Sequence, residues 1–344
     1  MKPSSFCALI ALAAPPAAAQ DDCVLLHNGT RIDGVRVSHY DVRSLRYTKG
    51  GSAASVATDQ VASITLGRFA DVYRRGLSAD QMLKVAREQL DARNPLLAQL
   101  GFVGAAARFF AAGEPAKATG ALDALQKAIP DAGVITESYR QKFAYFTSLA
   151  ATGAQNAAQV ARQYRSDALS GSWPEGFVVE AEFFLAMAER GSPKDFAARL
   201  RAVIAKSDAN PRIANRASVE LAHSLRTAKD VEAARRLYRD VADRDGVDAD
   251  SRAGALLGLG MLLLEQGTAA DPAAFKQALL LFLRVRLETR DAGPGLHAEA
   301  LYRAIVAADK WRGPDYSSIM ARCRRLLSDE FPGTEWAKLA KDHH

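Results

Sequence analysis

Residues 189–193 read Glu-Arg-Gly-Ser-Pro, and residues 111–115 read Ala-Ala-Gly-Glu-Pro. In both stretches glycine accepts the left-handed backbone conformation that commonly ends a helix, and proline suits the first turn of the helix that follows. Related turns recur at Gly113, Gly153, Gly191, Lys229 and Gly267, which are 40, 38, 38 and 38 residues apart. This spacing predicts a tandem array of helical hairpins with a period of about 38 residues.

The segments that flank these turns alternate between two kinds of predicted helix. The helix before each turn is rich in small and large apolar residues, and the helix after it is amphipathic. The first helices are expected at 101–111, 139–150, 178–188, 214–225, 253–264 and 297–308, and the second helices at 117–128, 157–164, 196–205, 232–241, 274–285 and 316–327. The predicted fold class is therefore mainly α, an α-solenoid of about six hairpins over residues 95–344.

A small β module is predicted over residues 20–68. Asn28-Gly29 is the strongest two-residue hairpin signal, because both positions of a type I′ turn need positive φ. Lys49-Gly50-Gly51-Ser52 marks another turn, and short apolar or β-branched runs lie on either side of both turns. Five short strands of this kind are typical of a small SH3-like barrel or of a strongly bent sheet.

Residues 69–94 are predicted to form a connecting helix between the β module and the hairpins. Ser78 followed three residues later by Gln81 is a capping box, which marks a helix start. The helix should end before Asn94-Pro95, because the residue before a proline disfavours the α conformation.

Residues 1–19 are predicted to be a secretory signal peptide. Lys2 gives a positive start, residues 6–14 a short apolar run and Ala17-Ala18-Ala19 a small-residue cleavage site, so Gln20 would be the first mature residue. The apolar run is too short to span a bilayer, which takes roughly 20 residues, and no later window is apolar enough. The chain is therefore expected to be exported, periplasmic or secreted, with no transmembrane segment after cleavage.

Two cysteines, Cys23 and Cys323, remain after removal of such a leader. Export would permit a disulfide between them. The alternative is a pair of unpaired, buried thiols. Sequence spacing does not decide between these two interpretations.

The chain has a formal net charge of +6, which suits acidic polymers or lipid head groups as partners, or simply a soluble basic surface. Arginines recur on the predicted second helices. Arg235, Arg236 and Arg239 form one cluster on the helix at 232–241, opposite its apolar face. These three are candidate partner-binding residues. The alternative is that they are solvated and that their stems cover apolar surface.

The sequence contains no motif for catalysis, a metal or a cofactor. It has no HExxH or CxxC pair, no GxSxG nucleophile turn and no Walker loop, and Gly258-Leu259-Gly260 is interpreted as helix packing. Glu180, Glu189 and Asp195 are the nearest approach to paired catalytic carboxylates, but a chain with 39 acidic residues supplies such groups by chance. We therefore expect no catalytic residue, no metal, no cofactor and no enzymatic activity.

Several stretches of the helical region resemble a known group of proteins. Residues 330–337, Glu-Phe-Pro-Gly-Thr-Glu-Trp-Ala, together with 255–260 and 298–302, resemble the repeats of tetratricopeptide-type proteins of the bacterial envelope. That group includes the Tol-Pal coordinator proteins and outer-membrane assembly lipoproteins. The period of this chain is longer than the 34 residues of the tetratricopeptide consensus, which implies longer loops between hairpins.

The β module resembles compact modules of many exported bacterial proteins, through Leu26, Asn28-Gly29, Gly34-Val35 and residues 59–64. Its fainter similarity to an Sm-type RNA-binding barrel fails at Asp41, which lies one residue late, so no nucleic acid partner is expected. The resemblance of the helical region implies a non-enzymatic scaffold that binds an envelope protein or peptide. The alternative function is binding of an anionic cell-wall polymer through the arginine-rich helix faces.

Overall fold

The structure is a computed structural model that describes residues 21–73, 76–149, 153–268 and 272–343. The chain divides into two compact units. We call the part up to Ala188 the N-terminal unit and the part from Glu189 onward the C-terminal unit. The predicted signal peptide, residues 1–19, lies outside the described residues. Among the residues described, no helix has both the length and the hydropathy needed to cross a bilayer.

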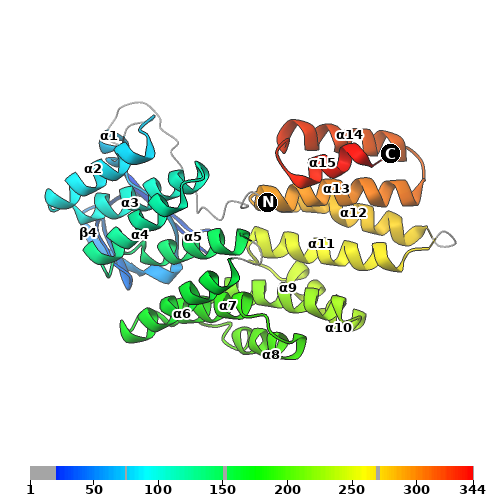
Figure 1. Cartoon of the computed structure of the whole chain (residues 1–344), viewed down its shortest axis with the longest axis horizontal. Helices are drawn as coiled ribbons and strands as arrows, with labels where there is room; N and C mark the ends of the chain where they lie inside the picture. The colour runs from blue at the N-terminus through cyan, green and yellow to red at the C-terminus, as the bar shows by residue number, and fades with distance from the viewer. Residues whose placement is uncertain (1–20, 74–75, 150–152, 269–271, 344) are drawn as a thin grey trace. The chain divides into compact units, whose positions relative to one another are not determined.

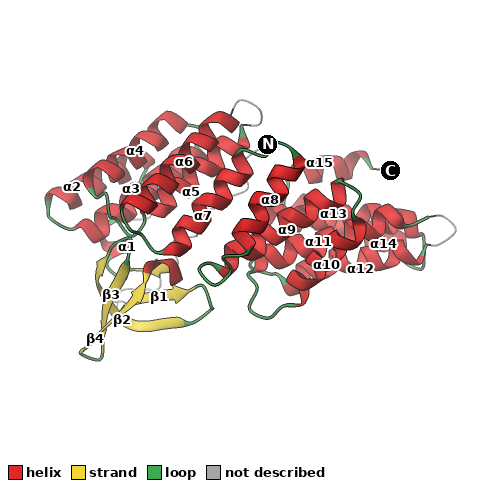
Figure 2. Cartoon of the chain, turned by 90° about the horizontal axis from the view of Figure 1, so that it is seen from below, coloured by secondary structure: helices red, strands yellow, loops and turns green. Residues whose placement is uncertain are grey.

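The N-terminal unit begins with a five-stranded antiparallel sheet in the order β4-β3-β2-β1-β5 (Figure 2). Its strands are β1 (Asp22–Leu26), β2 (Arg31–Tyr40), β3 (Ser44–Lys49), β4 (Ser52–Ala57) and β5 (Val61–Thr65). β2 pairs with β1 through its first half and with β3 through its second, with a register shift between Val37 and His39. Such a shift bends a strand. The sheet is open, so the predicted bent sheet is correct and the closed barrel is not.

Helices complete the N-terminal unit (Figure 1). They are α1 (Phe69–Val72), α2 (Ala79–Asp91), α3 (Pro95–Ala111), α4 (Pro115–Ala128), α5 (Ile135–Ser148), α6 (Ala154–Ser170) and α7 (Glu175–Ala188). Consecutive helices pack as hairpins, with α2 on α3, α3 on α4, α5 on α6 and α6 on α7. The predicted capping box of Ser78 and Gln81 begins α2. Residues 69–94, predicted as one connecting helix, contain both α1 and α2.

The C-terminal unit contains further helical hairpins. Its helices are α8 (Pro193–Ile204), α9 (Pro211–Thr227), α10 (Val231–Asp243), α11 (Ala249–Gln266), α12 (Ala273–Glu288), α13 (Pro294–Trp311), α14 (Tyr316–Glu330) and α15 (Glu335–Asp342). From α8 to α14 each helix packs on the next, α11 also contacts α9 and α13, and α15 lies against α13 and α14. The predicted fold class, mainly α with solenoid-like stacking of hairpins after a small sheet, is confirmed. Helix α15 was not predicted.

The predicted left-handed conformation is confirmed at Gly113 and Gly191, whose φ angles are 76° and 53°. Lys229, which stands in the corresponding turn without a glycine, is also left-handed, with a φ of 66°. Lysine is unusual in this conformation, because its Cβ approaches the following carbonyl oxygen at a cost of roughly 1–2 kcal/mol. These three turns therefore share one backbone geometry, which does not depend on glycine alone.

The left-handed prediction was wrong at Gly153 and Gly267, whose φ angles are −90° and −63°. Neighbouring atoms leave no room for a Cβ at either position, so glycine is required there for steric reasons. A Cβ on Gly153 would lie 1.8 Å from the carbonyl oxygen of Phe146, and a Cβ on Gly267 would lie 2.3 Å from the ring of Phe275.

One buried glutamine fixes the sheet to the helices of its own unit. Gln99 of α3 is 2% exposed; its Nε2 donates to the carbonyl oxygen of Tyr40 at 3.1 Å, and its Oε1 accepts from the N–H of Val134 at 3.3 Å. The N–H of Val42 also donates to the carbonyl oxygen of Asp131 at 2.8 Å. Because a buried amide is costly without partners, these bonds define how the β module packs on the helices.

A buried ion pair joins three helices of the N-terminal unit. Glu180 of α7 has a side chain 1% exposed, and it accepts from Nε and Nη2 of Arg140 on α5 at 2.9 and 2.8 Å. The hydroxyl of Tyr164 on α6 donates to the same carboxylate at 2.8 Å. A charge buried this deeply is tolerated only when it is fully paired, so the network fixes the relative positions of α5, α6 and α7.

Replacing Glu180 with leucine should lower the free energy of unfolding by roughly 3–5 kcal/mol, because Arg140 then keeps only its longer contact with Glu137, at 3.6 Å. The double variant Glu180→Leu with Arg140→Met should recover part of that loss, limited by Glu137, which loses its cation. Urea denaturation followed by circular dichroism measures both. As a control, Glu88→Gln removes an exposed pair with Lys84 at 3.9 Å and should cost less than about 1 kcal/mol. Equal losses in the single and double variants would contradict this account.

Helix α11 approaches its neighbours closely at two glycines. A Cβ on Gly258 would lie 2.3 Å from the ring of Tyr238 on α10, and a Cβ on Gly260 would lie 2.5 Å from the ring of Phe282 on α12. Both rings are fully buried. The predicted packing role of Gly258 and Gly260 is therefore confirmed.

Gly258→Ala should destabilise the chain by roughly 1–3 kcal/mol, because the added methyl group forces the Tyr238 ring out of its place. Gly120→Ala is the matched comparison, since a Cβ at that position in α4 meets nothing within 4 Å. That variant should be more stable than the parent by roughly 0.5–1 kcal/mol, through the better helix propensity of alanine. Thermal and urea unfolding measure the predicted loss of stability in Gly258→Ala and the predicted gain in Gly120→Ala. A Gly258→Ala protein as stable as the parent would refute the packing argument.

Candidate functional site

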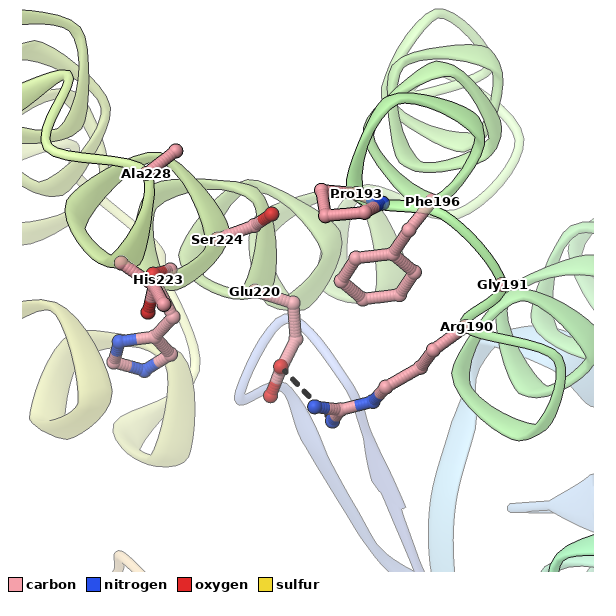
Figure 3. Close-up of a pocket in the computed structure, with 9 residues that line it drawn as sticks. Arg190, Gly191, Pro193, Phe196, Glu220, His223, Ser224 and Ala228 are labelled. Carbon is pink, nitrogen blue, oxygen red and sulfur yellow. Dashed lines mark hydrogen bonds and ion pairs between the residues drawn. The ribbon is translucent and has the colours of Figure 1, made fainter.

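The C-terminal unit contains a cleft of about 370 Å³ between the start of α8 and one face of α9 (Figure 3). Ligand pockets in proteins have volumes of roughly 300–1,000 Å³. The lining residues that matter for binding are Arg190, Pro193, Phe196, Glu220, His223 and Ser224.

Local sequence sets the two walls of the cleft. Gly191 turns the chain with a φ of 53°, and the hydroxyl of Ser192 then caps α8 by accepting from the N–H of Asp195 at 3.2 Å. Glu220, His223 and Ser224 are three and four residues apart on α9, which places them on one helix face. Arg190 and Phe196 therefore face a polar strip of α9.

Arg190 is the most exposed charged group of the cleft, with 61% of its side chain exposed. Its Nη2 lies 3.7 Å from Oε2 of Glu220, and its guanidinium lies 5.3 Å from the centre of the Phe196 ring. Figure 3 shows Arg190 and Glu220 pointing toward each other beside that ring. Because 3.7 Å is longer than a hydrogen bond, the N–H groups of Arg190 are not engaged by Glu220 and can donate to a ligand.

Burial affects both titratable groups on α9. It raises the pKa of Glu220, although Arg190 and Arg216 oppose the shift. It also lowers the pKa of His223 to about 4, and the nearby guanidinium groups of Arg226 and Arg190 add to that shift. The imidazole is therefore neutral at physiological pH.

A buried tyrosine fixes the imidazole of His223. The hydroxyl oxygen of Tyr238 lies 2.6 Å from Nδ1 of His223. A phenol is a stronger proton donor than a neutral imidazole, so the Tyr238 hydroxyl donates to Nδ1. This arrangement favours the tautomer with its proton on Nε2, which leaves an N–H donor on the cleft wall. The cleft thus combines an aromatic wall with a guanidinium, a carboxylate and a neutral imidazole, groups that bind and orient a ligand.

The three arginines singled out from the sequence lie on α10 and do not line this cleft. Arg235 is half-buried, donates to Oε1 of Gln266 at 2.8 Å and lies 3.4 Å from Glu232. Arg236 and Arg239 are exposed. No ion pair or hydrogen bond of their guanidinium groups occurs within the described part of the chain. Arg235 is therefore held by neighbouring side chains, Arg236 and Arg239 extend into solvent, and the partner-binding role of the three stays a prediction.

Other arginines of the second helices are paired with carboxylates. Arg199 pairs with Glu189 at 2.9 Å, Arg284 with Glu288 at 2.6 Å and Arg286 with Glu330 at 2.8 Å. The negative charge of these carboxylates offsets part of the positive charge that the recurring arginines place on the second helices.

Cys23 on β1 and Cys323 on α14 are free thiols. Burial raises the pKa of Cys323 to about 11, and burial together with a hydrogen bond to Asp33 raises the pKa of Cys23. Because the thiolate is the reactive form, both react slowly at neutral pH. Cys23 belongs to the N-terminal unit and Cys323 to the C-terminal unit, and their pairing stays a prediction.

The carboxylates weighed from the sequence each have a structural role. Glu180 binds Arg140, Glu189 binds Arg199 and Asp195 accepts a hydrogen bond from the hydroxyl of Ser192 at 2.7 Å. Within the described ranges, no three histidine, cysteine or acidic side chains lie close enough together to hold a metal ion.

Sequence reasoning missed the cleft residues. Glu220, His223 and Ser224 carried one usable signal, a polar strip at helical spacing on a first helix whose other face is apolar. Their partner Arg190 belongs to a different hairpin, and no local pattern joins the two.

Comparison with known proteins gives no family for this chain: no family model matches it, and no curated protein matches it significantly.

Acid should destabilise the chain through His223. Its pKa is about 4 in the folded chain and about 6.5 when unfolded, so between these values only the unfolded chain binds the proton. The free energy of unfolding should therefore fall as the pH drops from 6.5 to 4, by about 3 kcal/mol at the most. His223→Gln should flatten this part of the curve, as measured by urea unfolding across that range. Parallel curves for the two proteins would show that His223 does not cause the loss of stability in acid. The raised pKa of Glu220 affects both proteins in the same way, so its contribution cancels when the two curves are compared.

Proposed function

We propose that this chain is a non-enzymatic binding scaffold of the cell envelope, built from tetratricopeptide-like repeats, and that a partner protein or peptide docks in the Arg190–Glu220 cleft. The single observation that carries the proposal is the cleft itself, where an exposed arginine lies over a buried aromatic ring in a stack of helical hairpins. Arginine and aromatic residues carry much of the binding energy at protein interfaces. The leader-like sequence of residues 1–19 supports export, to the periplasm or outside the cell.

Binding of an anionic cell-wall polymer is the second candidate function. The exposed and unpaired Arg236 and Arg239 favour it. The carboxylate partners of Arg199, Arg284 and Arg286 weaken it, because a polymer would have to compete with pairs that already exist. The scaffold function is therefore preferred.

Arg190→Glu should lower retention of the protein partner by about tenfold or more, since it reverses the charge that meets the ligand. The measurement is a pull-down from envelope extract with the chain from Gln20 onward, washed at low and then high salt. Arg201→Glu is the matched control, because Arg201 is exposed on α8 but does not line the cleft. Both the parent chain and this control should keep the partner at high salt.

The same experiment separates the two candidate functions. A double variant, Arg236→Ala with Arg239→Ala, should retain the protein partner. If instead only wall polymer is captured, and if salt and this double variant both release it, the polymer function replaces the scaffold function. Equal retention by Arg190→Glu and the parent chain would remove the cleft from the interface.

A further inference from the structure

The sheet of the N-terminal unit has two edge strands, and β4 is the more exposed of them. Its order places β4 and β5 at the two margins. Four of the five residues of β5 are buried or half-buried, and its Val61 and Ile64 line a small cavity of about 70 Å³ with Leu100 and Val103 of α3. The backbone of β4 pairs with β3, and no other backbone hydrogen bond of residues 52–56 occurs within the described chain. Figure 2 shows β4 at the outer margin of the sheet.

The register of the β3–β4 hairpin identifies the free backbone groups. Lys49 pairs with Ser52 across the two-residue Gly50-Gly51 loop, and the register has no shift along the hairpin. The pair that closes such a loop is hydrogen-bonded, and hydrogen-bonded pairs then alternate with non-bonded pairs. Ala53 and Ser55 therefore direct their N–H and C=O groups away from β3, toward the open edge.

This edge has none of the usual protections against strand addition. Natural edges carry proline, charged side chains or a bulge. β4 reads Ser-Ala-Ala-Ser-Val-Ala, and four of its six residues are exposed. An uncharged, regular and exposed edge favours the addition of another extended strand.

Two unpaired arginines determine which strand fits. Arg46 lies opposite Ser55, Arg36 opposite Thr48, and Thr48 opposite Ala53, so all of them share one face of the sheet. Both arginines are exposed, and within the described chain neither guanidinium has an ion pair or hydrogen bond. Neighbouring strands lie about 4.8 Å apart, and the side chains of β4 on this face are short. Arg46 can therefore reach over β4 to a strand beyond it.

We propose that β4 binds an extended acidic segment of a partner protein by strand addition, with acidic side chains facing Arg46 and with Arg36 adding to the positive potential of that face. This surface is separate from the cleft of the proposed function and does not depend on it. A second copy of the chain fits less well, because it would bring two more unpaired arginines to the same face.

The test uses two labelled eight-residue peptides, one alternating glutamate with valine or threonine, the other with lysine in place of glutamate. Their binding to the chain is measured by fluorescence anisotropy at low salt. The glutamate peptide should bind, and the lysine peptide should bind about tenfold more weakly or not at all. Equal affinity for the two peptides, or no binding of the glutamate peptide at millimolar concentration, would overturn the proposal.

Ser55→Pro removes an outward N–H while sparing the bonds to β3, so it should weaken binding of the glutamate peptide by about tenfold. Ser55→Ala keeps that N–H and should bind like the parent chain. If both variants bind like the parent, the edge is not the site. Circular dichroism reports whether the proline variant is folded.

Arg46→Glu tests the charge independently of the proline variant. It should weaken binding of the glutamate peptide by about fivefold or more, while Lys84→Glu, an exposed charge reversal on α2 of the same unit, should not. Light scattering tests whether a second copy of the chain covers the edge instead. A dimer that dissociates in the Ser55→Pro variant would show this and would overturn the proposal of an acidic partner. Because these variants leave Arg190 intact, their failure does not affect the proposed function of the cleft.

Discussion

Each helical hairpin of this chain has an apolar face that is buried only when a neighbouring hairpin packs against it. That requirement explains the nearly constant spacing of the turns, since each repeat must present the same face to the next. It also explains Gly258 and Gly260, which stand where the rings of Tyr238 and Phe282 meet α11. In the C-terminal unit the same stacking places α8 beside α9, and the cleft lies between these two helices.

Features with a local cause could be predicted from the sequence, and features with a distant cause could not. The capping box of Ser78 and Gln81 and the left-handed Gly113 and Gly191 depend on residues within one turn of chain, and these predictions were correct. Gly153 and Gly267 are fixed instead by nearby groups that fill the space a Cβ would need. The open sheet was left undecided because barrel closure depends on whether β4 meets β5, a contact that neither strand specifies by itself.

The candidate site shows the same limit. The arginine pattern predicted a binding face, but the state of each arginine depends on carboxylates from elsewhere, as when Glu330 of α14 pairs with Arg286 of α12. Arg190 had no distinguishing pattern, and it becomes notable only because Phe196 and Glu220 lie beside it in the folded unit. Pairing and exposure, which the sequence does not contain, determine which arginine is available for binding.

The two proposed surfaces use different chemistry, and this difference makes them separable. The cleft relies on side chains around a buried ring, where contact area and desolvation matter and salt has a limited effect. The β4 edge relies on backbone hydrogen bonds to the added strand and on the attraction between exposed arginines and its acidic side chains. That attraction is screened beyond about 8 Å at physiological salt. A partner held by the cleft should therefore persist when salt is raised, whereas an acidic strand beside Arg46 should dissociate. A chain with both surfaces would hold one partner firmly and exchange the other with ionic conditions.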